Sequence, residues 1–157
     1  MNKKFTIYLF SFALLFSASD LAIKKTYVEV GIASIIETKD NNNVIIDIYA
    51  INKMPIAGIQ FEIMPSNLFT IDSISGGRCA QLGFELHSNN KGLLLAFSLR
   101  GEEISISKNN IPNRNILFSV YGKKNKVIHN QVIDLKTTLA SKMGKKINSK
   151  VVKYIYK

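Results

Sequence analysis

Ile56–Ile63 reads IAGIQFEI, and the same region continues with SGG at Ser75–Gly77, GF at Gly83–Phe84 and GLLLAFSLRG at Gly92–Gly101. Apolar and polar residues alternate along the first of these segments, which places Ile59, Phe61 and Ile63 on one face of a β-strand. Gln60 and Glu62 then point to the opposite, solvated face. The glycines permit positive φ angles and sharp reversals between strands. The region therefore predicts antiparallel strands, and it contains no residue pattern typical of an active site.

Period-two alternation continues on both sides of this region. No window of helical length shows an apolar stripe with helical spacing. We expect strands at 27–36, 44–51, 57–64, 68–74, 82–87, 93–99, 116–121, 128–139 and 151–156, with a turn at Asp40–Asn43. About nine short strands separated by turn signals predict an all-β protein in which two antiparallel sheets pack face to face.

Strand parity predicts which side chains face the core in two of the later strands. In the first, the pattern predicts Leu93, Leu95, Phe97 and Leu99 inward and Leu94, Ala96 and Ser98 outward. In the second, it predicts Ile116, Phe118 and Val120 inward and Leu117, Ser119 and Tyr121 outward. A shift of one residue in the register would invert either assignment.

The N-terminal residues are typical of a secretory signal peptide. Lys3 and Lys4 precede an apolar stretch at 5–16, and small residues follow at Ser17–Ser19. The apolar stretch is shorter than the roughly 20 residues that span a bilayer. We therefore expect a signal peptide at 1–19, a β-sandwich domain at 20–147 and a Lys-rich end at 148–157 that forms a last strand or is partly disordered. Export predicts a secreted protein, either extracellular or in the cell envelope, including the periplasm.

The chain is basic, with a formal net charge of +10, but nearly all of its positive residues are lysines. Arg78, Arg100 and Arg114 are the exceptions. Readout of phosphates and bases favours the planar guanidinium group of arginine, so we expect no nucleic-acid partner. The sequence favours a solvated, Lys-rich surface and leaves open an attraction to an acidic polysaccharide or envelope surface.

The chemically reactive residues do not form a catalytic or metal-binding pattern. His87 and His129 lie at no ligand spacing with Cys or carboxylates, so we expect no metal and no cofactor. Cys79 has no partner for a disulfide and is expected to be buried. Glu102 and Glu103 are adjacent, so on a strand they would point to opposite faces, and we interpret them as loop charges. The sequence therefore predicts a protein that is not an enzyme.

Several of these segments, in this order, resemble the cohesin domain, particularly free-standing cohesin-like domains in exported proteins of marine bacteria. The resemblance covers roughly Tyr27 to Ile147 and follows IAGIQFEI, SGG, GF, GLLLAFSLRG, a Pro-containing loop, ILFSV and IDLKTTLASKMGKKI. It implies a jelly-roll β-sandwich like that of some carbohydrate-binding modules, in which one flat sheet face receives the helix pair of a dockerin. The turn at Ser141–Lys145 lacks the acidic residues that such domains often carry there, so we predict no calcium at this turn.

The resemblance, combined with strand parity, implies a binding face. It consists of Gln60, Glu62, Glu85, His87, Leu94, Ser98, Leu117, Ser119 and Tyr121. The first expectation is a secreted, non-enzymatic module that binds a dockerin-like protein partner or acts in a scaffold.

Two other functions remain open. A carbohydrate-binding module acting on extracellular polysaccharide would use exposed aromatic rings, and we expect Tyr49, Tyr121, Tyr154 and Tyr156 to face solvent. The third reading is a structural exported subunit that self-associates through its strand edges.

Overall fold

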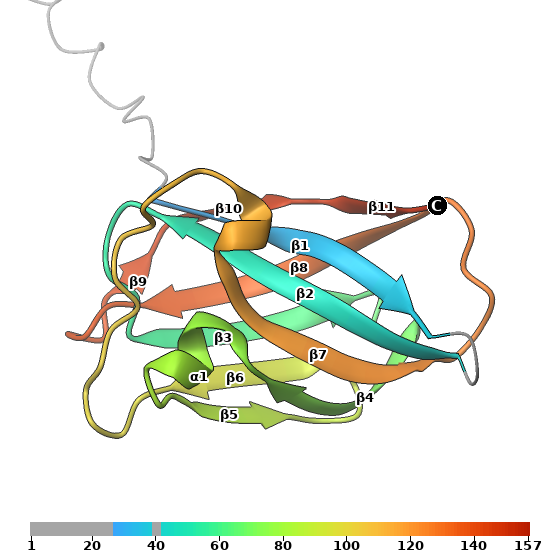
Figure 1. Cartoon of the computed structure of the whole chain (residues 1–157), viewed down its shortest axis with the longest axis horizontal. Coiled ribbons are helices and arrows are strands. Elements are labelled where there is room, and N and C mark those ends of the chain that lie inside the picture. The colour runs from blue at the N-terminus through green and yellow to red at the C-terminus, as the bar shows by residue number, and fades with distance from the viewer. Residues whose placement is uncertain (1–26, 39–41) are drawn as a thin grey trace, which may run out of the picture.

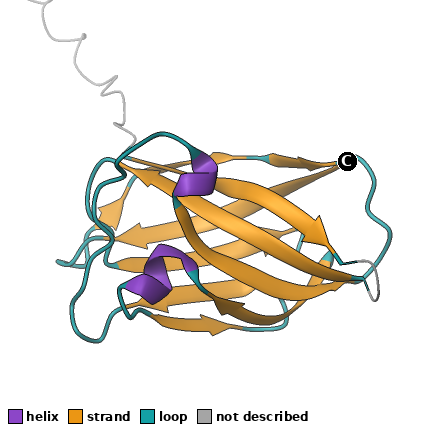
Figure 2. Ribbon diagram, viewed as in Figure 1, coloured by secondary structure: helices purple, strands orange, loops and turns teal. Residues whose placement is uncertain are grey.

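Two β-sheets pack face to face in the computed structural model, which describes residues 27–38 and 42–157 (Figure 1). Strands and loops make up nearly all of this part of the chain, and Figure 2 shows short helical turns only outside the two sheets. The predicted signal peptide at 1–19 lies outside the described residues, as do Asp40 and Asn41 of the predicted turn.

The first sheet has the strand order β10-β1-β2-β7-β4. Its members are β1 (Val28–Glu37), β2 (Asn43–Asn52), β4 (Phe69–Ser75), β7 (Ile116–Lys124) and β10 (Ser149–Val152). Neighbours in this sheet are antiparallel except for β1 and β10, which are parallel.

The second sheet has the order β11-β8-β3-β6-β5, and β9 pairs with β8 off this path. Its strands are β3 (Gly58–Met64), β5 (Glu85–Ser88), β6 (Leu93–Phe97), β8 (Gln131–Ala140), β9 (Lys146–Ile147) and β11 (Tyr154–Tyr156). The remaining elements are α1 (Gly77–Gln81) and the 3-10 turn η1 (Pro112–Arg114). This arrangement confirms the predicted all-β sandwich.

The core fills the space between the sheets with side chains from alternate positions of the strands. Phe61 from β3 and Phe118 from β7 meet there, with ring centroids 6.0 Å apart. Both rings are fully buried, and burial of a side chain of this size stabilises the fold by roughly 1.5–3 kcal/mol. The side chains of Ile59, Phe61 and Ile63 are buried, which confirms the face predicted for them. Alternate residues of the first two strands are buried as well: Val28, Val30, Ile32, Val44, Ile46 and Ile48.

The region predicted as a strand at 82–87 begins as a turn, because the short helix α1 ends at Gln81 just before it, and a shorter strand then starts at Glu85. Gly76 and Gly77 have the positive φ angles expected of a sharp reversal, 79° and 63°. The chain then forms α1, which packs on β7, before β5 begins at Glu85. The five residues of α1 are too few to show a helical apolar period. The strand prediction was therefore wrong for the first half of this region.

The predicted outward position of Leu117 is also wrong, since this side chain is fully buried. Ile48 pairs with Phe118 and Tyr49 pairs with Ile116, so Leu117 is the extra residue of a β-bulge in β7. The adjacent α1 covers this part of β7. A bulge and a covering helix thus add one buried position to the alternation read from the sequence.

The parity predicted for β6 is inverted. Leu94 and Ala96 are fully buried, whereas Phe97 is 38% exposed and Leu99 is 79% exposed. The register with β3 explains the inversion, because Leu94 lies opposite Phe61, which faces the core. The strand reads LLLAF, so both of its faces are apolar and the pattern alone does not distinguish them.

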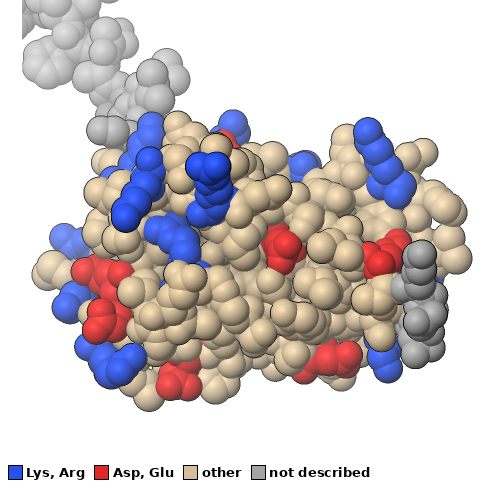
Figure 3. Space-filling model, viewed as in Figure 1, with Lys and Arg blue, Asp and Glu red and all other residues tan. Residues whose placement is uncertain are grey.

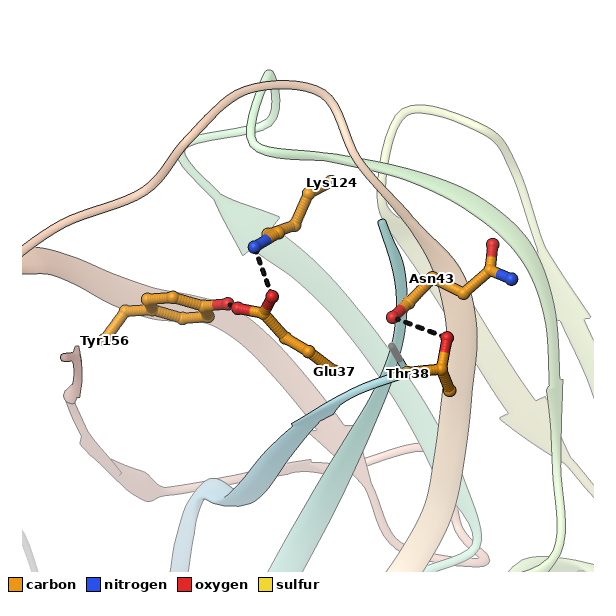
Figure 4. Close-up of polar contacts among 5 residues, drawn as sticks. All are labelled: Glu37, Thr38, Asn43, Lys124 and Tyr156. Atoms are coloured by element: carbon orange, nitrogen blue, oxygen red, sulfur yellow. Dashed lines mark hydrogen bonds and ion pairs between the residues drawn. The ribbon is translucent and has the colours of Figure 1, made fainter. Parts of the chain in front are cut away.

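A polar cluster joins three strands at one end of the sandwich (Figure 4). The carboxylate of Glu37, at the end of β1, accepts hydrogen bonds from Lys124 of β7 and from the Tyr156 hydroxyl of β11. The Lys124 ammonium also lies 5.9 Å from the centroid of the Tyr156 ring. Nearby, the Thr38 hydroxyl lies 3.4 Å from the carbonyl oxygen of Asn43. The cluster therefore connects the C-terminal strand to the first sheet.

Substitution of Gly77 tests the packing of α1 on β7. A Cβ atom at Gly77 would lie 2.3 Å from the Leu117 carbonyl oxygen, whereas a Cβ at Gly144, which has a similar φ of 71°, meets nothing within 4 Å. Gly144→Ala should cost about 1–2 kcal/mol for the left-handed backbone alone. Gly77→Ala should lower the free energy of unfolding by roughly 3 kcal/mol or more, because the backbone must also move. Urea unfolding followed by circular dichroism measures both, and equal losses would contradict the packing described here.

Candidate functional site

The outer face of strands β8, β3, β6 and β5 is the candidate site, and we call it the docking face. The strand register sets its side chains in rows across the four strands. In one row, Gln60 lies between Leu95 and Thr138, with His87 beyond Leu95. In the next row, Glu62 lies between Leu93 and Lys136. The third row places Phe97 between Gly58 and Glu85.

An apolar stripe formed by Leu93, Leu95 and Phe97 runs along β6 through the middle of the docking face. Leu93 and Leu95 are half-buried and Phe97 is more exposed than either. The imidazole ring of His87 stacks on the Phe97 ring, with centroids 5.7 Å apart and planes inclined by 16°. The stripe therefore offers a continuous apolar surface supported by a regular sheet.

Polar and charged side chains border the stripe on the β8 side. The Lys136 ammonium lies 3.2 Å from the Glu62 carboxylate, and the Lys153 ammonium lies 3.5 Å from the Asp134 carboxylate. Both ion pairs are solvent-exposed, so each contributes at most about 1 kcal/mol to stability. Their positions make them suitable for polar contacts around an apolar centre.

The docking face brings together four of the predicted site residues. Gln60, Glu62, Glu85 and His87 all project from the outer side of the second sheet. The face predicted from the sequence lacked the stripe residues Leu93, Leu95 and Phe97 and the β8 residues Lys136 and Thr138. The available signal was the run LLLAF, in which unbroken apolarity indicates that the outer face of the strand is apolar too.

The other five predicted site residues lie elsewhere. Leu94 and Leu117 are buried and cannot contact a partner. Ser98 lies in the turn after β6, where its hydroxyl oxygen accepts hydrogen bonds from the backbone N–H groups of Arg100 and Glu102. Leu94, Leu117 and Ser98 were therefore wrongly predicted to belong to the binding face.

Ser119 and Tyr121 belong to β7, so they lie on the outer face of the opposite sheet. The Ser119 hydroxyl donates a 2.6 Å hydrogen bond to the Asp47 carboxylate, which also accepts a 2.8 Å bond from Ser34. Because β7 belongs to the first sheet, no register of this strand could place Tyr121 beside Gln60. The single predicted face therefore combined residues from opposite sides of the sandwich.

Tyrosine side chains do not form an exposed platform in the described part of the chain. Tyr49 and Tyr156, which we expected to face solvent, are buried, with exposed fractions of 3% and 6%. Burial and the neighbouring Glu29 carboxylate raise the pKa of Tyr49 to about 12, and the Tyr49 hydroxyl donates a hydrogen bond to Glu29. Tyr121 is exposed but lies on the first sheet.

Reactive groups do not converge on the docking face. Within residues 27–38 and 42–157, the His, Cys, Asp and Glu side chains form no group that could hold a metal ion. Cys79 is fully buried in α1, and burial raises the pKa of its thiol to about 12, so the nucleophilic thiolate is scarce at neutral pH. Glu102 and Glu103 lie in the loop after β6, as predicted.

Comparisons with solved structures identify domains with the same fold. The sixth cohesin from scaffoldin B of Acetivibrio cellulolyticus, solved in complex with a mutant Cel5 dockerin, aligns with a TM-score of 0.54 at 13% identity, covering 82% of this chain and 96% of that one. The third ScaB cohesin of R. flavefaciens, in complex with a group 1 dockerin, gives 0.51 at 20% identity, covering 82% and 92%. A non-cellulosomal cohesin from the archaeon Archaeoglobus fulgidus gives 0.52 at 12% identity, covering 82% and 88%.

These likenesses show that the chain has the cohesin fold, a jelly-roll sandwich, which confirms the fold implied by the sequence resemblance. Searches by sequence find no matching family model and no matching curated protein. Within the described residues, the helices are too short and too polar to cross a bilayer.

Alanine substitutions at two neighbouring residues of β6 test which of its faces is buried. Leu94→Ala should lower the free energy of unfolding by about 2–5 kcal/mol, because it removes a fully buried side chain next to Phe61. Leu95→Ala, its matched control on the docking face, should cost less than about 1 kcal/mol. Urea unfolding followed by circular dichroism gives both values. The reverse order would mean that the register of β6 is shifted by one residue.

Proposed function

We propose that the protein is a non-enzymatic binding module that holds a protein partner against its docking face. The observation that carries this proposal is the apolar stripe of half-buried Leu93 and Leu95 and exposed Phe97 on a regular four-strand surface. Protein interfaces typically place apolar and aromatic side chains at the centre and polar groups at the rim. The docking face has this arrangement, with Gln60 and the Glu62–Lys136 ion pair beside the stripe.

The binding energy would come mainly from removing the stripe from water. Phe97 and Leu95 should contribute the largest part of the binding free energy, since well-packed aromatic and apolar anchors near the centre of an interface dominate affinity. His87 supports Phe97 by stacking against its ring, which limits the orientations that the phenyl group can adopt. Glu62, Gln60 and Thr138 supply hydrogen-bonding groups that fix the orientation of the partner.

A dockerin-like helix pair is the partner class that this face suits best. The compared structures include cohesins solved in complex with dockerins, and they share the fold of this chain. A helix laid across β6 could place apolar side chains on the stripe while its polar side contacts the β8 row. We place this interaction outside the cytoplasm, because the N-terminal sequence is typical of a signal peptide.

No specific observation favours the alternative of a carbohydrate-binding module at this face. Sugar recognition by stacking requires exposed aromatic rings on one surface, and the docking face offers Phe97 as its aromatic group alongside His87. The described tyrosines are buried, half-buried, or on the opposite sheet.

Substitutions in the stripe should strongly weaken partner binding without unfolding the protein. The purified protein serves as bait for proteins secreted by the organism of origin, and a captured protein is then purified and titrated by calorimetry. The Leu95→Asp/Phe97→Asp variant should bind it at least roughly 30-fold more weakly, because two anchors are lost and charges are introduced into the interface.

The matched control for this experiment is Tyr121→Asp, which introduces a charge at an exposed aromatic residue on the other sheet. It should bind the partner as tightly as the unmodified protein does. Loss of binding with Tyr121→Asp but not with the stripe variant would overturn the proposal. A glycan array run in parallel that shows tight binding to a sugar through the stripe would favour the carbohydrate-binding alternative instead.

A further inference from the structure

A second surface feature lies away from the docking face, where α1, η1 and the loop after β6 come together. A hollow of about 170 Å³ is lined by Arg78, Lys108 and Arg114 together with Ser105, Asn109 and Asn115. We call it the cationic hollow. Figure 3 shows lysine and arginine side chains gathered on this part of the visible face, around α1 and η1. Among its described lining residues there is no carboxylate.

Arg78 lies in the cationic hollow and has only neutral partners in the described part of the chain. Its guanidinium group donates to the carbonyl oxygens of Ala50 and Ser105, the Asn52 side-chain oxygen and the Ser107 hydroxyl. Burial lowers the pKa of Arg78, yet the guanidinium keeps its charge at neutral pH. A half-buried positive charge without a carboxylate partner makes the hollow a favourable place for an anion.

The backbone that carries the other two cations is held firmly. The buried side chain of Asn115 donates hydrogen bonds to the carbonyl oxygens of Asn109 and Ile111, at 3.0 and 2.9 Å. Asn52, also buried, donates to the Ser105 carbonyl oxygen at 2.9 Å. These bonds keep the loop that bears Lys108 and the turn that bears Arg114 in one arrangement before any ligand arrives. Such preorganisation lowers the entropic cost of binding.

A larger hollow of about 460 Å³ is lined in part by Asn110, the residue that follows Asn109 of the cationic hollow. It is lined by Lys53 and Lys150 as well as Tyr27, Glu29 and Ile51. The Glu29 carboxylate accepts a hydrogen bond from Tyr49. Positive side chains thus line both hollows, which suits an extended ligand with repeated negative charges rather than one isolated ion.

We propose that the cationic hollow binds an anionic group of an acidic polysaccharide, a sulfate ester or a uronate carboxylate, and that the neighbouring hollow accommodates the adjoining sugars. A volume of about 170 Å³ exceeds that of several water molecules, at roughly 30 Å³ each, so it accommodates such a group. Recognition of single-stranded nucleic acid typically uses aromatic rings that stack on bases. The described lining of the cationic hollow contains no aromatic residue on which a base could stack, and its arginine, lysine and asparagine groups suit the charged group of an acidic sugar.

Calorimetric titration of the purified protein with a heparin hexasaccharide tests this proposal. The Lys108→Ala/Arg114→Ala variant should bind at least about tenfold more weakly, since two charged contacts are lost. Both side chains are exposed and form no ion pair in the described part of the chain, so the variant should fold normally. Circular dichroism checks the fold.

The control variant Lys123→Ala/Lys126→Ala removes the same net charge from exposed positions at the far end of β7. It should bind within about threefold of the unmodified protein in the same buffer, because diffuse charge contributes little once salt screens it. An equal loss in both variants, or no binding by the unmodified protein, would overturn the proposal.

Two further ligands define the chemistry. A desulfated hexasaccharide that no longer binds would support recognition of sulfate esters, and one that still binds through Lys108 and Arg114 would support recognition of carboxylates. A single-stranded oligonucleotide with the same number of negative charges should bind more weakly. Equal or tighter binding of the oligonucleotide through the same residues would contradict the assignment to a polysaccharide.

Discussion

The pairing of β3 with β6 is the constraint on which the rest of the structure depends. The Phe61 side chain faces the core, where its ring packs near that of Phe118, and Leu94 lies opposite Phe61 in the strand register. Leu94 and Ala96 must therefore be buried, and Leu95 and Phe97 must lie outside. A strand that is apolar on both sides leaves hydrophobic surface exposed whichever way it turns. The apolar stripe is thus a direct consequence of how the second sheet is paired.

The two proposed surfaces would bind their ligands through different interactions. The docking face offers apolar area whose removal from water supplies the free energy of binding, with charges confined to its border. The cationic hollow offers positive charge on backbone segments held in place by buried asparagine side chains. Because these surfaces involve different residues, binding at one of them leaves the residues of the other free to bind a second ligand.

The accuracy of sequence reasoning varied with the local pattern. Alternation in IAGIQFEI has one polar face, so its burial was predicted correctly from Ile59 to Ile63. The stretch ILFSVYG alternates too, but a bulge at Leu117 and the cover provided by α1 bury a residue that alternation placed outside. Arg78 and Asn52 are 26 residues apart in the chain, so nothing in the local sequence indicated that they meet.

The sequence by itself determined the class of fold: strands with alternating apolar residues, divided by glycine and asparagine turns and without an amphipathic helix to cover them, bury their apolar faces by packing sheet against sheet. Which residues share a surface was decided only by the tertiary structure. Parity within a strand is a local property, whereas the assignment of β7 to the first sheet and of β3, β5 and β6 to the second arises from contacts between distant segments. For this reason Tyr121 and Gln60, alike in their strand pattern, lie on opposite sides of the molecule.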